Sequence, residues 1–364
     1  MKTIKVNLNN RSYPIIINAD DFKQLAQLIL KLNLGTDAFI ITNSRIAKLY
    51  AGKLKKALAG IKIKFFFKTV KDSETSKSID EYMKTVKAIS AMDTGKRIFI
   101  IALGGGVIGD LSGFVAATYK RGINYVQVPT TLLAQVDSAI GGKTAVDLAT
   151  GKNLVGAFYQ PRIVYSNISV LKSLPRRQIK SGLAEIIKYG VIVEPRLFNF
   201  CDKNYKKILA LEERSLSYII STASKIKAKI VSFDEKETKG MRTILNFGHT
   251  IGHALETAVN YKTLNHGEAI SIGMVCAAEI AEELGIMEKS HTQNLIKILK
   301  KFKLPVSIKN VNIKKVFAAF YHDKKFINGK IRMILPTRIG HVIVSENIQL
   351  SIIKKVMEKR LRAK

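Results

Sequence analysis

Three of the chain's six histidines lie in one short segment, residues 242–269, together with an arginine and an asparagine. Polar residues recur there every three or four positions: Arg242, Asn246, His249 and His253. This spacing predicts that their side chains lie along one face of a single helix. Neutral imidazole is a common metal ligand, and a divalent ion held by two histidines and one carboxylate can polarise a substrate oxygen. The pattern favours a metal-dependent site over a solvated helix face.

The residue spacing alone leaves the set of metal ligands open. His249 and His253 are four positions apart, as in an H-E-x-x-H helix, but Thr250 stands where that motif needs its glutamate, so a zinc protease is disfavoured. In the stretch SGLAEIIKYG, Glu185 lies one helical turn before Lys188 and is suited to be a third ligand. Taken alone, that pair would be interpreted as a salt bridge on a helix surface.

The length and charge of the chain limit the number of domains and the kinds of ligand to expect. At 364 residues the chain can bury a large core, and its length favours two domains. Lysine and arginine total 60 against 28 aspartates and glutamates, so the net charge is +32 and attracts anionic ligands. The basic residues are spread along the whole chain, without a zinc-finger spacing or an RNP-like motif. We therefore interpret most of them as solvated surface and expect no nucleic-acid partner.

The cysteines and the N-terminal sequence indicate a cellular compartment. Cys201 and Cys276 lie far apart in helix-like sequence, so neither a disulfide framework nor a cysteine-rich metal site is indicated. The N-terminal residues alternate like a strand and lack the apolar core of a signal peptide. No window of apolar residues is long enough to span a membrane. We expect a cytoplasmic protein with no membrane partner.

The order of apolar patterns predicts two domains. Strand-like segments alternate with helical ones in the first part: KTIKVNL, PIIIN, DAFIITN, IKFFFKTV, RIFIIALGGG and NYVQVPT. This alternation predicts an α/β domain with a largely parallel, Rossmann-like sheet over residues 1–170. Long helical periodicities follow, so residues 171–364 are expected to form a mostly α-helical domain. A cleft between such domains is the default place for an active site.

A glycine turn follows the strand RIFIIAL. Gly104, Gly106 and Gly109 match the G-x-G-x-x-G pattern between a strand and a helix, where backbone amides can bind a pyrophosphate. An ordinary dinucleotide fingerprint also has an acidic residue at the end of the next strand. That strand ends here in Pro129, Thr130 and Thr131. A nucleotide is therefore expected, in a geometry that differs from the ordinary dehydrogenase.

Further charged residues lie next to turn-forming glycines. The stretch from 128 to 161 contains Asp137, Lys143, Lys152 and Asn153, and we interpret it as a glycine-rich loop that faces a ligand. Lys324 and Lys325 precede a hairpin-like turn, where surface lysines are the ordinary interpretation.

Seven motifs in this order resemble the 3-dehydroquinate synthase family of sugar phosphate cyclases: GGGVIGD, VPTTLLAQVDSAIGGKTAVD, GKNLVGAFYQP, SGLAEIIKYG, RTILNFGHTIGHALE, NHGEA and DKK. The resemblance implies an NAD-binding α/β domain, a helical metal-binding domain and a homodimer. It implies Glu185, His249 and His266 as ligands of zinc or cobalt, and leaves His253 to contact substrate as an acid–base or hydrogen-bonding group.

The resemblance also implies the residues that hold NAD: Asn43, Asp72, Glu74, Lys77, Gly105, Gly106, Val107, Ile108, Gly109, Asp110, Thr130, Thr131, Lys143, Lys152, Val170, Leu171, Lys172 and Ser173. Asn43 stands where some members carry aspartate. An asparagine still hydrogen-bonds a ribose, but it discriminates less firmly against a 2′-phosphate.

The implied reaction converts 3-deoxy-D-arabino-heptulosonate 7-phosphate (DAHP) into 3-dehydroquinate and phosphate, by transient oxidation, phosphate elimination, reduction and aldol closure. Arg242 best fits the substrate carboxylate, while Lys188, Asn153 and Arg121 of a neighbouring subunit fit its phosphate. The other expected substrate contacts are Asp137, Lys143, Lys152, Lys227, Asn246, His253, Lys324 and Lys325. Another sugar phosphate cyclase and a metal-dependent NAD polyol dehydrogenase are the alternatives. The segment before Arg242 is one residue longer than the family pattern, which leaves the role of Glu237 open.

Overall fold

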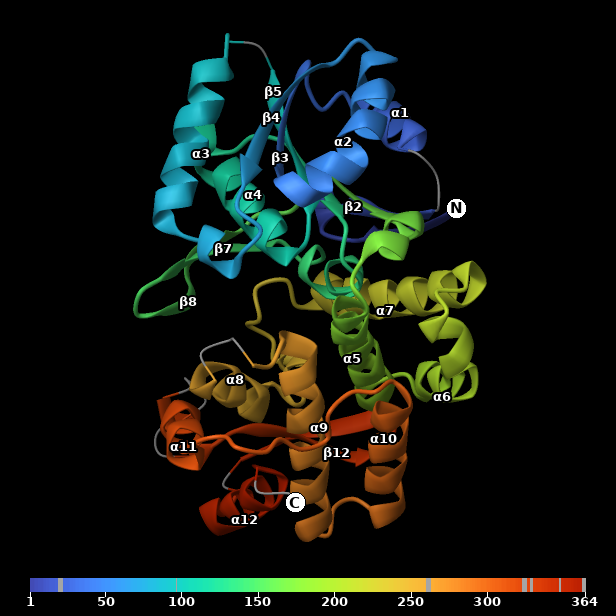
Figure 1. The fold of residues 1–364 in the computed structure, drawn as a ribbon, viewed down its shortest axis with the longest axis vertical. Helices are drawn as coiled ribbons and strands as arrows, with labels where there is room; N and C mark the ends of the chain where they lie inside the picture. The colour runs from blue at the N-terminus through green and yellow to red at the C-terminus, as the bar shows by residue number, and fades with distance from the viewer. Residues whose placement is uncertain are drawn as a thin grey trace. The chain divides into compact units, whose positions relative to one another are not determined.

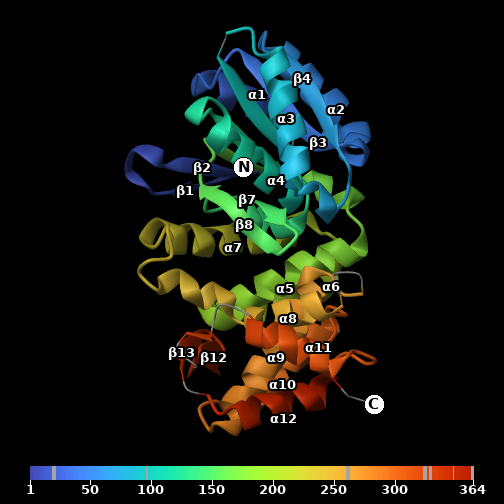
Figure 2. The same cartoon turned by 90° about the vertical axis from the view of Figure 1, so that its left-hand side faces the viewer.

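The structure is a computed structural model that describes residues 1–18, 22–95, 97–259, 263–322, 326–327, 330–346 and 348–361. The chain divides into two units, drawn in Figures 1 and 2. The first unit comprises Met1–Leu174 and Leu216–Lys236, and the second comprises Pro175–Ser215 and Glu237–Lys364. The expected division into two uninterrupted segments at residue 170 did not include the return of Leu216–Lys236 to the first unit.

A seven-stranded sheet forms the centre of the first unit, in the order β1-β2-β9-β6-β5-β3-β4. Its strands are β1 (Lys2–Val6), β2 (Tyr13–Asn18), β3 (Asp37–Asn43), β4 (Lys64–Val70), β5 (Ile98–Gly104), β6 (Tyr125–Pro129) and β9 (Ile163–Asn167). Only the pairing of β1 with β2 is antiparallel within this sheet. The predicted largely parallel α/β sheet is therefore confirmed.

Helices cover both faces of this sheet, as Figure 1 shows. The helices are α1 (Lys23–Lys31), α2 (Ser44–Ala59), α3 (Ile79–Met92) and α4 (Gly106–Thr118). Alternate residues of a strand point to opposite faces, so Ile40 packs with α1 and α2 while Phe39 and Ile41 pack with α3 and α4. Because both faces are buried, the central strands are continuously apolar rather than alternating.

The strand order reverses between β3 and β5. The chain passes from β3 to β4 at the sheet edge and then crosses to β5 on the other side of β3. In open parallel sheets, ligands bind beyond the carboxyl ends of the strands at such a point. Asn43 ends β3 and Gly104 ends β5, so both lie where a ligand is expected.

Residues 143–158 form an antiparallel hairpin of β7 (Lys143–Leu148) and β8 (Gly151–Phe158), so their interpretation as a loop was wrong. The glycines that suggested a loop allow close strand approach instead. A Cβ at Gly156 would lie 2.2 Å from the carbonyl oxygen of Thr144, which leaves room only for glycine. The remaining short elements of the first unit are η1 (Asn9–Arg11), η2 (Glu74–Ser76), η3 (Tyr119–Arg121), the π-helical η4 (Ala134–Ser138) and η5 (Ile168–Ser173).

Most of helix α7 (Glu213–Phe233) belongs to the first unit, to which polar side chains bind it. Lys227 Nζ donates to Asp137 Oδ1 at 2.6 Å and to the Asp137 carbonyl at 2.7 Å. Ser224 Oγ donates to the Gln135 carbonyl at 3.3 Å. These bonds link two residues expected to contact substrate, Asp137 and Lys227, inside one unit.

The second unit is mostly helical, as predicted. Its helices are α5 (Arg176–Ile192), α6 (Pro195–Leu209), η6 (Met241–Asn246), α8 (His249–Ala258), α9 (His266–Glu283), α10 (Lys289–Lys301), α11 (Ile313–His322) and α12 (Leu350–Leu361). Short strands complete it: β10 (Phe326–Ile327), β11 (Lys330–Ile331), β12 (Met333–Arg338) and β13 (His341–Ser345). Helix α9 is buried nearly all round, between α5, α8, α10 and α12. Among the described residues, no helix is both long and apolar enough to cross a bilayer.

The prediction that Arg242, Asn246, His249 and His253 share one continuous helix is wrong. Arg242 and Asn246 lie on the 3-10 helix η6, whereas α8 begins at His249. Gly248 separates the two helices with a φ of 78°, a left-handed conformation that favours glycine. A Cβ there would also lie 2.9 Å from the Met274 backbone nitrogen of α9. The break therefore lets α8 pack closely against α9.

Candidate metal centre and nucleotide site

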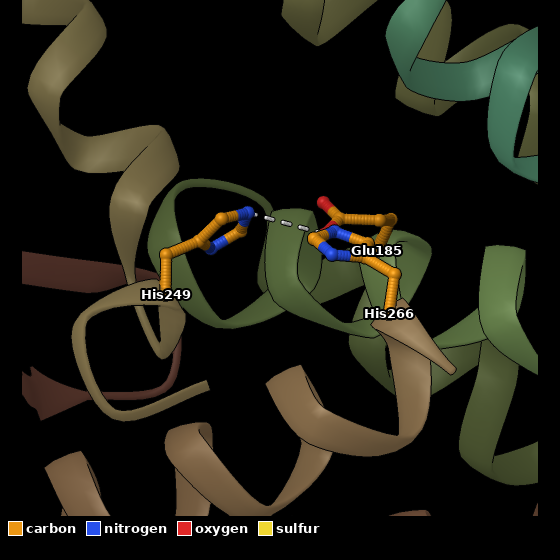
Figure 3. A group of neighbouring side chains, drawn as sticks. All are labelled: Glu185, His249 and His266. Atoms are coloured by element: carbon orange, nitrogen blue, oxygen red, sulfur yellow. Dashed lines mark hydrogen bonds and ion pairs between the residues drawn. The ribbon is translucent and has the colours of Figure 1, made fainter. Parts of the chain in front are cut away.

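Glu185, His249 and His266 point toward one another in the second unit, from α5, α8 and α9 respectively (Figure 3). His249 Nε2 lies 3.6 Å and His266 Nε2 lies 3.3 Å from Glu185 Oε1. The three ligand atoms all lie within 4.8 Å of one another. Two imidazoles and one carboxylate form the donor set that suits zinc, and such a set also accepts cobalt. The residues present therefore fit a divalent metal.

The starts of α8 and α9 position the two histidines. His266 is the first residue of α9, which begins with a capping box between Asn265 and Glu268. Gly267 follows, and its backbone N–H donates a hydrogen bond to Ser181 Oγ of α5 at 3.0 Å. A Cβ at Gly267 would lie 2.4 Å from Ser181 Cα, so glycine permits the contact. Ser181 lies one turn before Glu185, and the contact thus brings His266 to the carboxylate.

The charged side chains Glu185 and Lys188 are buried at this candidate metal centre. Glu185 is 0% and Lys188 1% exposed, and the two side chains form an ion pair. The pair is therefore not the surface salt bridge of the alternative interpretation. Burial lowers the pKa of His249 well below its ordinary value, and the nearby Lys188 charge lowers it further. His249 is accordingly neutral at pH 7 and able to donate its lone pair to a metal.

His266 has a different environment because a carboxylate faces each ring nitrogen. Its Nδ1 lies 3.3 Å from Glu256 Oε2, while its Nε2 faces Glu185. Burial alone would lower the pKa of His266, but hydrogen bonds to Glu185 and Glu256 outweigh burial and raise the pKa to about 10. His253, Glu256 and His266 form a second group whose ligand atoms lie within 4.8 Å of one another.

Two of the remaining expected residues of this unit, Arg242 and Asn246, lie on η6. Arg242 is buried, and its Nε lies 3.3 Å from Glu237 Oε1. Glu237 thus contacts the Arg242 guanidinium even though the segment before Arg242 is one residue longer than the family pattern. Asn246 is half-buried at the end of η6, and His253 is exposed on α8. Lys324 and Lys325 lie outside the described residues.

The glycine turn of the first unit is closely packed. Gly105 is the N-cap of α4, which has no side-chain cap. A Cβ at Gly105 would lie 3.0 Å from Thr131 Cγ2, and one at Gly109 would lie 2.8 Å from Gln127 Oε1. Thr130 donates its N–H to the Gly104 carbonyl at 2.9 Å. Its hydroxyl is buried and has no hydrogen-bond partner among the described residues, as expected of a group that binds a ligand.

The other residues expected to hold NAD form two pairs and one cluster in the same unit. Asn43 Nδ2 donates to Asp72 Oδ1 at 2.9 Å, while Asn43 Oδ1 caps α2 by accepting from the Ile46 nitrogen at 2.8 Å. Lys152 Nζ donates to Glu74 Oε1 at 2.9 Å.

The cluster is centred on Lys77, whose Nζ donates to Asp110 and to Asn153. Burial raises the pKa of Asp110, and the Lys77 charge opposes this rise. Asn153, which we expected at the phosphate, thus contacts Lys77, a residue expected at the nucleotide.

Val170, Leu171, Lys172 and Ser173 lie on η5, after β9. Tyr50 Oη donates to the Val170 carbonyl at 3.1 Å and lies 2.6 Å from Ser173 Oγ. Arg121, Lys143 and Lys172 are exposed. The contacts of Tyr50 fix the backbone of η5 beside the carboxyl ends of the strands.

Sequence reasoning missed Glu256, which the structure places behind His266. The signal was present, because Glu256 lies seven positions after His249 and three after His253, on one face of α8. A buried carboxylate on the face that carries two histidines indicates a supporting role.

Two family models match this chain. One, described as 3-dehydroquinate synthase N-terminal, covers residues 67–181, and the other, described as 3-dehydroquinate synthase C-terminal, covers residues 182–326. A protein named 3-dehydroquinate synthase from Caldanaerobacter subterraneus subsp. tengcongensis is 43% identical over 94% of this chain and 96% of its own length. Another of that name from Aliivibrio fischeri is 41% identical over 99% of each chain.

Solved structures share the fold. A 2-deoxy-scyllo-inosose synthase complexed with carbaglucose-6-phosphate, NAD+ and Co2+ superposes with a TM-score of 0.88 at 26% identity, covering 99% of this chain and 100% of its own. An iron-containing alcohol dehydrogenase from Thermotoga maritima superposes with a TM-score of 0.69 at 15% identity, covering 99% of each chain. The second likeness concerns the fold alone.

Proposed function

This chain belongs to the 3-dehydroquinate synthase family, and from that membership we propose that it converts DAHP into 3-dehydroquinate and inorganic phosphate. It is then a lyase that eliminates phosphate from a small sugar acid phosphate. The observation that carries the proposal is the convergence of Glu185, His249 and His266 in a chain that matches the family in both of its halves.

We propose NAD and a divalent metal, zinc or cobalt, as cofactors. When bound, NAD accepts and returns a hydride, and the metal acts as a Lewis acid toward the substrate hydroxyls. The donor set at Glu185 supports the metal, and the uncapped α4 turn with the buried Thr130 hydroxyl supports the dinucleotide. The solved 2-deoxy-scyllo-inosose synthase complex holds NAD+ and Co2+ in the same fold.

Each unit contributes a different function in this proposal. The first unit holds NAD through Asn43, Asp72, Glu74, Lys77, the residues from Gly105 to Asp110, Thr130, Thr131, Lys143, Lys152 and the residues from Val170 to Ser173. The second holds the metal through Glu185, His249 and His266. His253, exposed on α8 with its ring centroid 5.2 Å from that of His249, is available to hydrogen-bond substrate or move a proton.

Arg242 binds the substrate carboxylate in this proposal. It is buried, and its Nε is held by Glu237, which orients the planar guanidinium for a bidentate contact. Lys188 binds the phosphate, with Asn153 and with Arg121 of a second subunit. Asp137, Lys143, Lys152, Lys227, Asn246, Lys324 and Lys325 complete the proposed substrate contacts.

The assembly and the compartment are also proposals. We propose a homodimer, because Arg121 is exposed and suited to reach the phosphate of another subunit. We propose the cytoplasm, because Cys201 and Cys276 are buried free thiols, which fits a reducing compartment. We propose no nucleic-acid partner.

The decisive experiment measures phosphate release from DAHP with NAD and Zn2+ or Co2+ present, followed by identification of the carbocycle. We expect 3-dehydroquinate and phosphate in equal amounts, without net NADH, because the hydride returns to the intermediate. A polyol dehydrogenase would accumulate NADH. A cyclase for substrates without a carboxylate would release no phosphate from DAHP. Either result would contradict the proposal.

A further inference from the structure

Helix α8 places a buried carboxylate behind one of the two histidines that face Glu185. Glu256 Oε2 lies 3.3 Å from His266 Nδ1, on the side of the ring opposite to Nε2. Glu256 is only 8% exposed, although a carboxylate is normally solvated unless it has a structural or functional partner. The energetic cost of burying this charge therefore needs a partner, and the imidazole of His266 is one.

Close backbone packing fixes this contact. Gly252 lies one turn before Glu256, and a Cβ there would lie 3.2 Å from Ile270 Cα of α9. On α9, a Cβ at Gly273 would lie 2.0 Å from the Gly248 carbonyl oxygen. Glycine at these positions lets α8 and α9 approach at van der Waals distance. The Glu256 carboxylate thereby reaches the side chain of His266, the first residue of α9.

The two histidines are held by acceptors of different strength. His249 Nδ1 lies 3.1 Å from the Phe247 carbonyl oxygen, a neutral acceptor, whereas His266 Nδ1 faces the charged Glu256. A ring whose Nδ1–H donates to an acceptor keeps Nε2 for a metal, and a carboxylate acceptor also raises the electron density at Nε2. In both rings, the acceptor at Nδ1 thus leaves Nε2, the nitrogen that faces Glu185, available to bind a metal.

We propose that Glu256 is a positioning residue for the metal: its carboxylate accepts the Nδ1–H of His266, fixes the tautomer and ring orientation, and strengthens Nε2 as a ligand. The proposal deepens the proposed function, because it rests on a metal bound by Glu185, His249 and His266. Glu256 itself does not contact the ion.

The test measures Zn2+ and Co2+ affinity by titrating the metal-free protein against a competing chelator. Removing a partner of a metal-ligating histidine typically costs about 10–100-fold in metal affinity, and this fall is expected for Glu256→Ala. Glu256→Gln retains an oxygen acceptor without the charge, so its fall should be smaller, roughly tenfold or less. Visible absorption of bound Co2+ should change in both variants, because the orientation of one ligand changes.

Glu279→Gln is the matched control, since Glu279 is also a buried carboxylate of the second unit but pairs with Lys359 and Arg360 on α12. It should keep wild-type metal affinity even if its melting temperature falls. Thermal melts of the metal-free variants separate loss of folding from loss of binding, and Glu256→Gln serves if Glu256→Ala does not fold.

Two results would overturn the role of Glu256. The first is wild-type affinity and an unchanged Co2+ spectrum in folded Glu256→Ala and Glu256→Gln. The second is uptake of two ions by the wild type and of one by Glu256→Gln, which would make Glu256 a ligand with His253 and His266. A wild type that binds one ion but releases no phosphate from DAHP would instead contradict the proposed reaction and leave this inference intact.

Discussion

His249 and His253 lie one turn apart on α8, yet their surroundings differ enough to give them different roles. His249 faces the buried Glu185 carboxylate, and its pKa is lowered by burial, so it is a neutral donor. His253 is exposed, and its ring lies edge-on to that of His249 at 5.2 Å. An exposed imidazole can meet substrate, whereas one that faces the carboxylate is suited to hold an ion.

We therefore expect His249→Ala to lose metal and turnover together. His253→Ala should retain the metal but turn over more slowly, by about 10²–10⁴-fold if His253 moves a proton. Metal content by atomic absorption, measured beside phosphate release, separates the two variants. Metal loss in His253→Ala with retention in His249→Ala would exchange the two assignments.

Arg242 offers a second test, because a guanidinium and an ammonium bind a carboxylate differently. Arg242→Lys keeps the charge but loses the planar fork, so kcat/KM for DAHP should fall at least tenfold, about 1.4 kcal/mol at the transition state. Metal affinity should not change, since Arg242 lies on η6 and pairs with Glu237. Unchanged kcat/KM would remove Arg242 from the carboxylate site.

Among the helices and strands, the break between η6 and α8 depends on one glycine. Gly240 and Gly248 have nearly equal φ values of 77° and 78°, but a Cβ at Gly240 has no atom within 4 Å. Gly248→Ala should destabilise the protein more than Gly240→Ala, because it adds a clash with Met274 to the left-handed strain. The strain alone costs roughly 1–2 kcal/mol.

Chemical denaturation of the two variants measures this difference. Gly248→Ala should also weaken Co2+ binding, since it displaces the residue next to His249, while Gly240→Ala should bind normally. Equal stabilities would mean that α8 shifts to accept the Cβ, and that the close approach to α9 is not needed.

Apolar periodicity predicted the helices and strands better than it predicted which distant segments they pack against. Helix α5 (Arg176–Ile192) contains the SGLAEIIKYG stretch that was expected to be helical, and the central strands also lie where expected. The hairpin of β7 and β8 was not predicted, because its glycines suggest turns when the neighbouring strand is unknown. The break at Gly248 was not predicted either, because its cause is the backbone of α9, which is distant in sequence.

The same limit applies to the candidate site. Histidine crowding singled out His249, His253 and His266, and Glu185 was already a candidate third ligand. Only the family resemblance chose His249 and His266 over His253 as the expected ligands. Glu256 has no distinctive spacing to His266, which lies beyond a turn on another helix. Three-dimensional proximity was needed to connect them.

In the protein as a whole, the two cysteines report on the integrity of the second unit. Cys201 and Cys276 are buried, and burial raises the pKa of each thiol to about 12. Because the thiolate is the reactive species, neither should react with a disulfide reagent at pH 8 in the folded protein, while both should react in denaturant. Rapid reaction without denaturant would mean that the second unit opens readily.

Acid stability provides a further test, through the contact of α9 with α12. Burial alone would raise the pKa of Glu279, but hydrogen bonds from Arg360 and Lys359 outweigh it and lower the pKa below the ordinary value of 4.5. The stability that Glu279 contributes is thus complete above pH 4.5 and is lost as pH falls through the lowered folded pKa.

Glu279→Gln should be less stable than the wild type near pH 7, by at least about 1.5 kcal/mol for the lost charged hydrogen bonds. The gap should narrow below pH 4.5, where the wild-type carboxylate becomes protonated. Urea melts at several pH values measure both effects. A gap that stayed constant down to pH 3 would contradict the lowered pKa.

The return of Leu216–Lys236 to the first unit means that the chain passes between the units three times. No single cleavage can therefore release either unit whole. A fragment that ends at Leu174 would lack Lys227, so Asp137 would lose its bond to that ammonium group, and the first unit would lack Leu216–Lys236. Adding Leu216–Lys236 back to such a fragment would restore the partner of Asp137 and complete the unit that we propose binds the nucleotide.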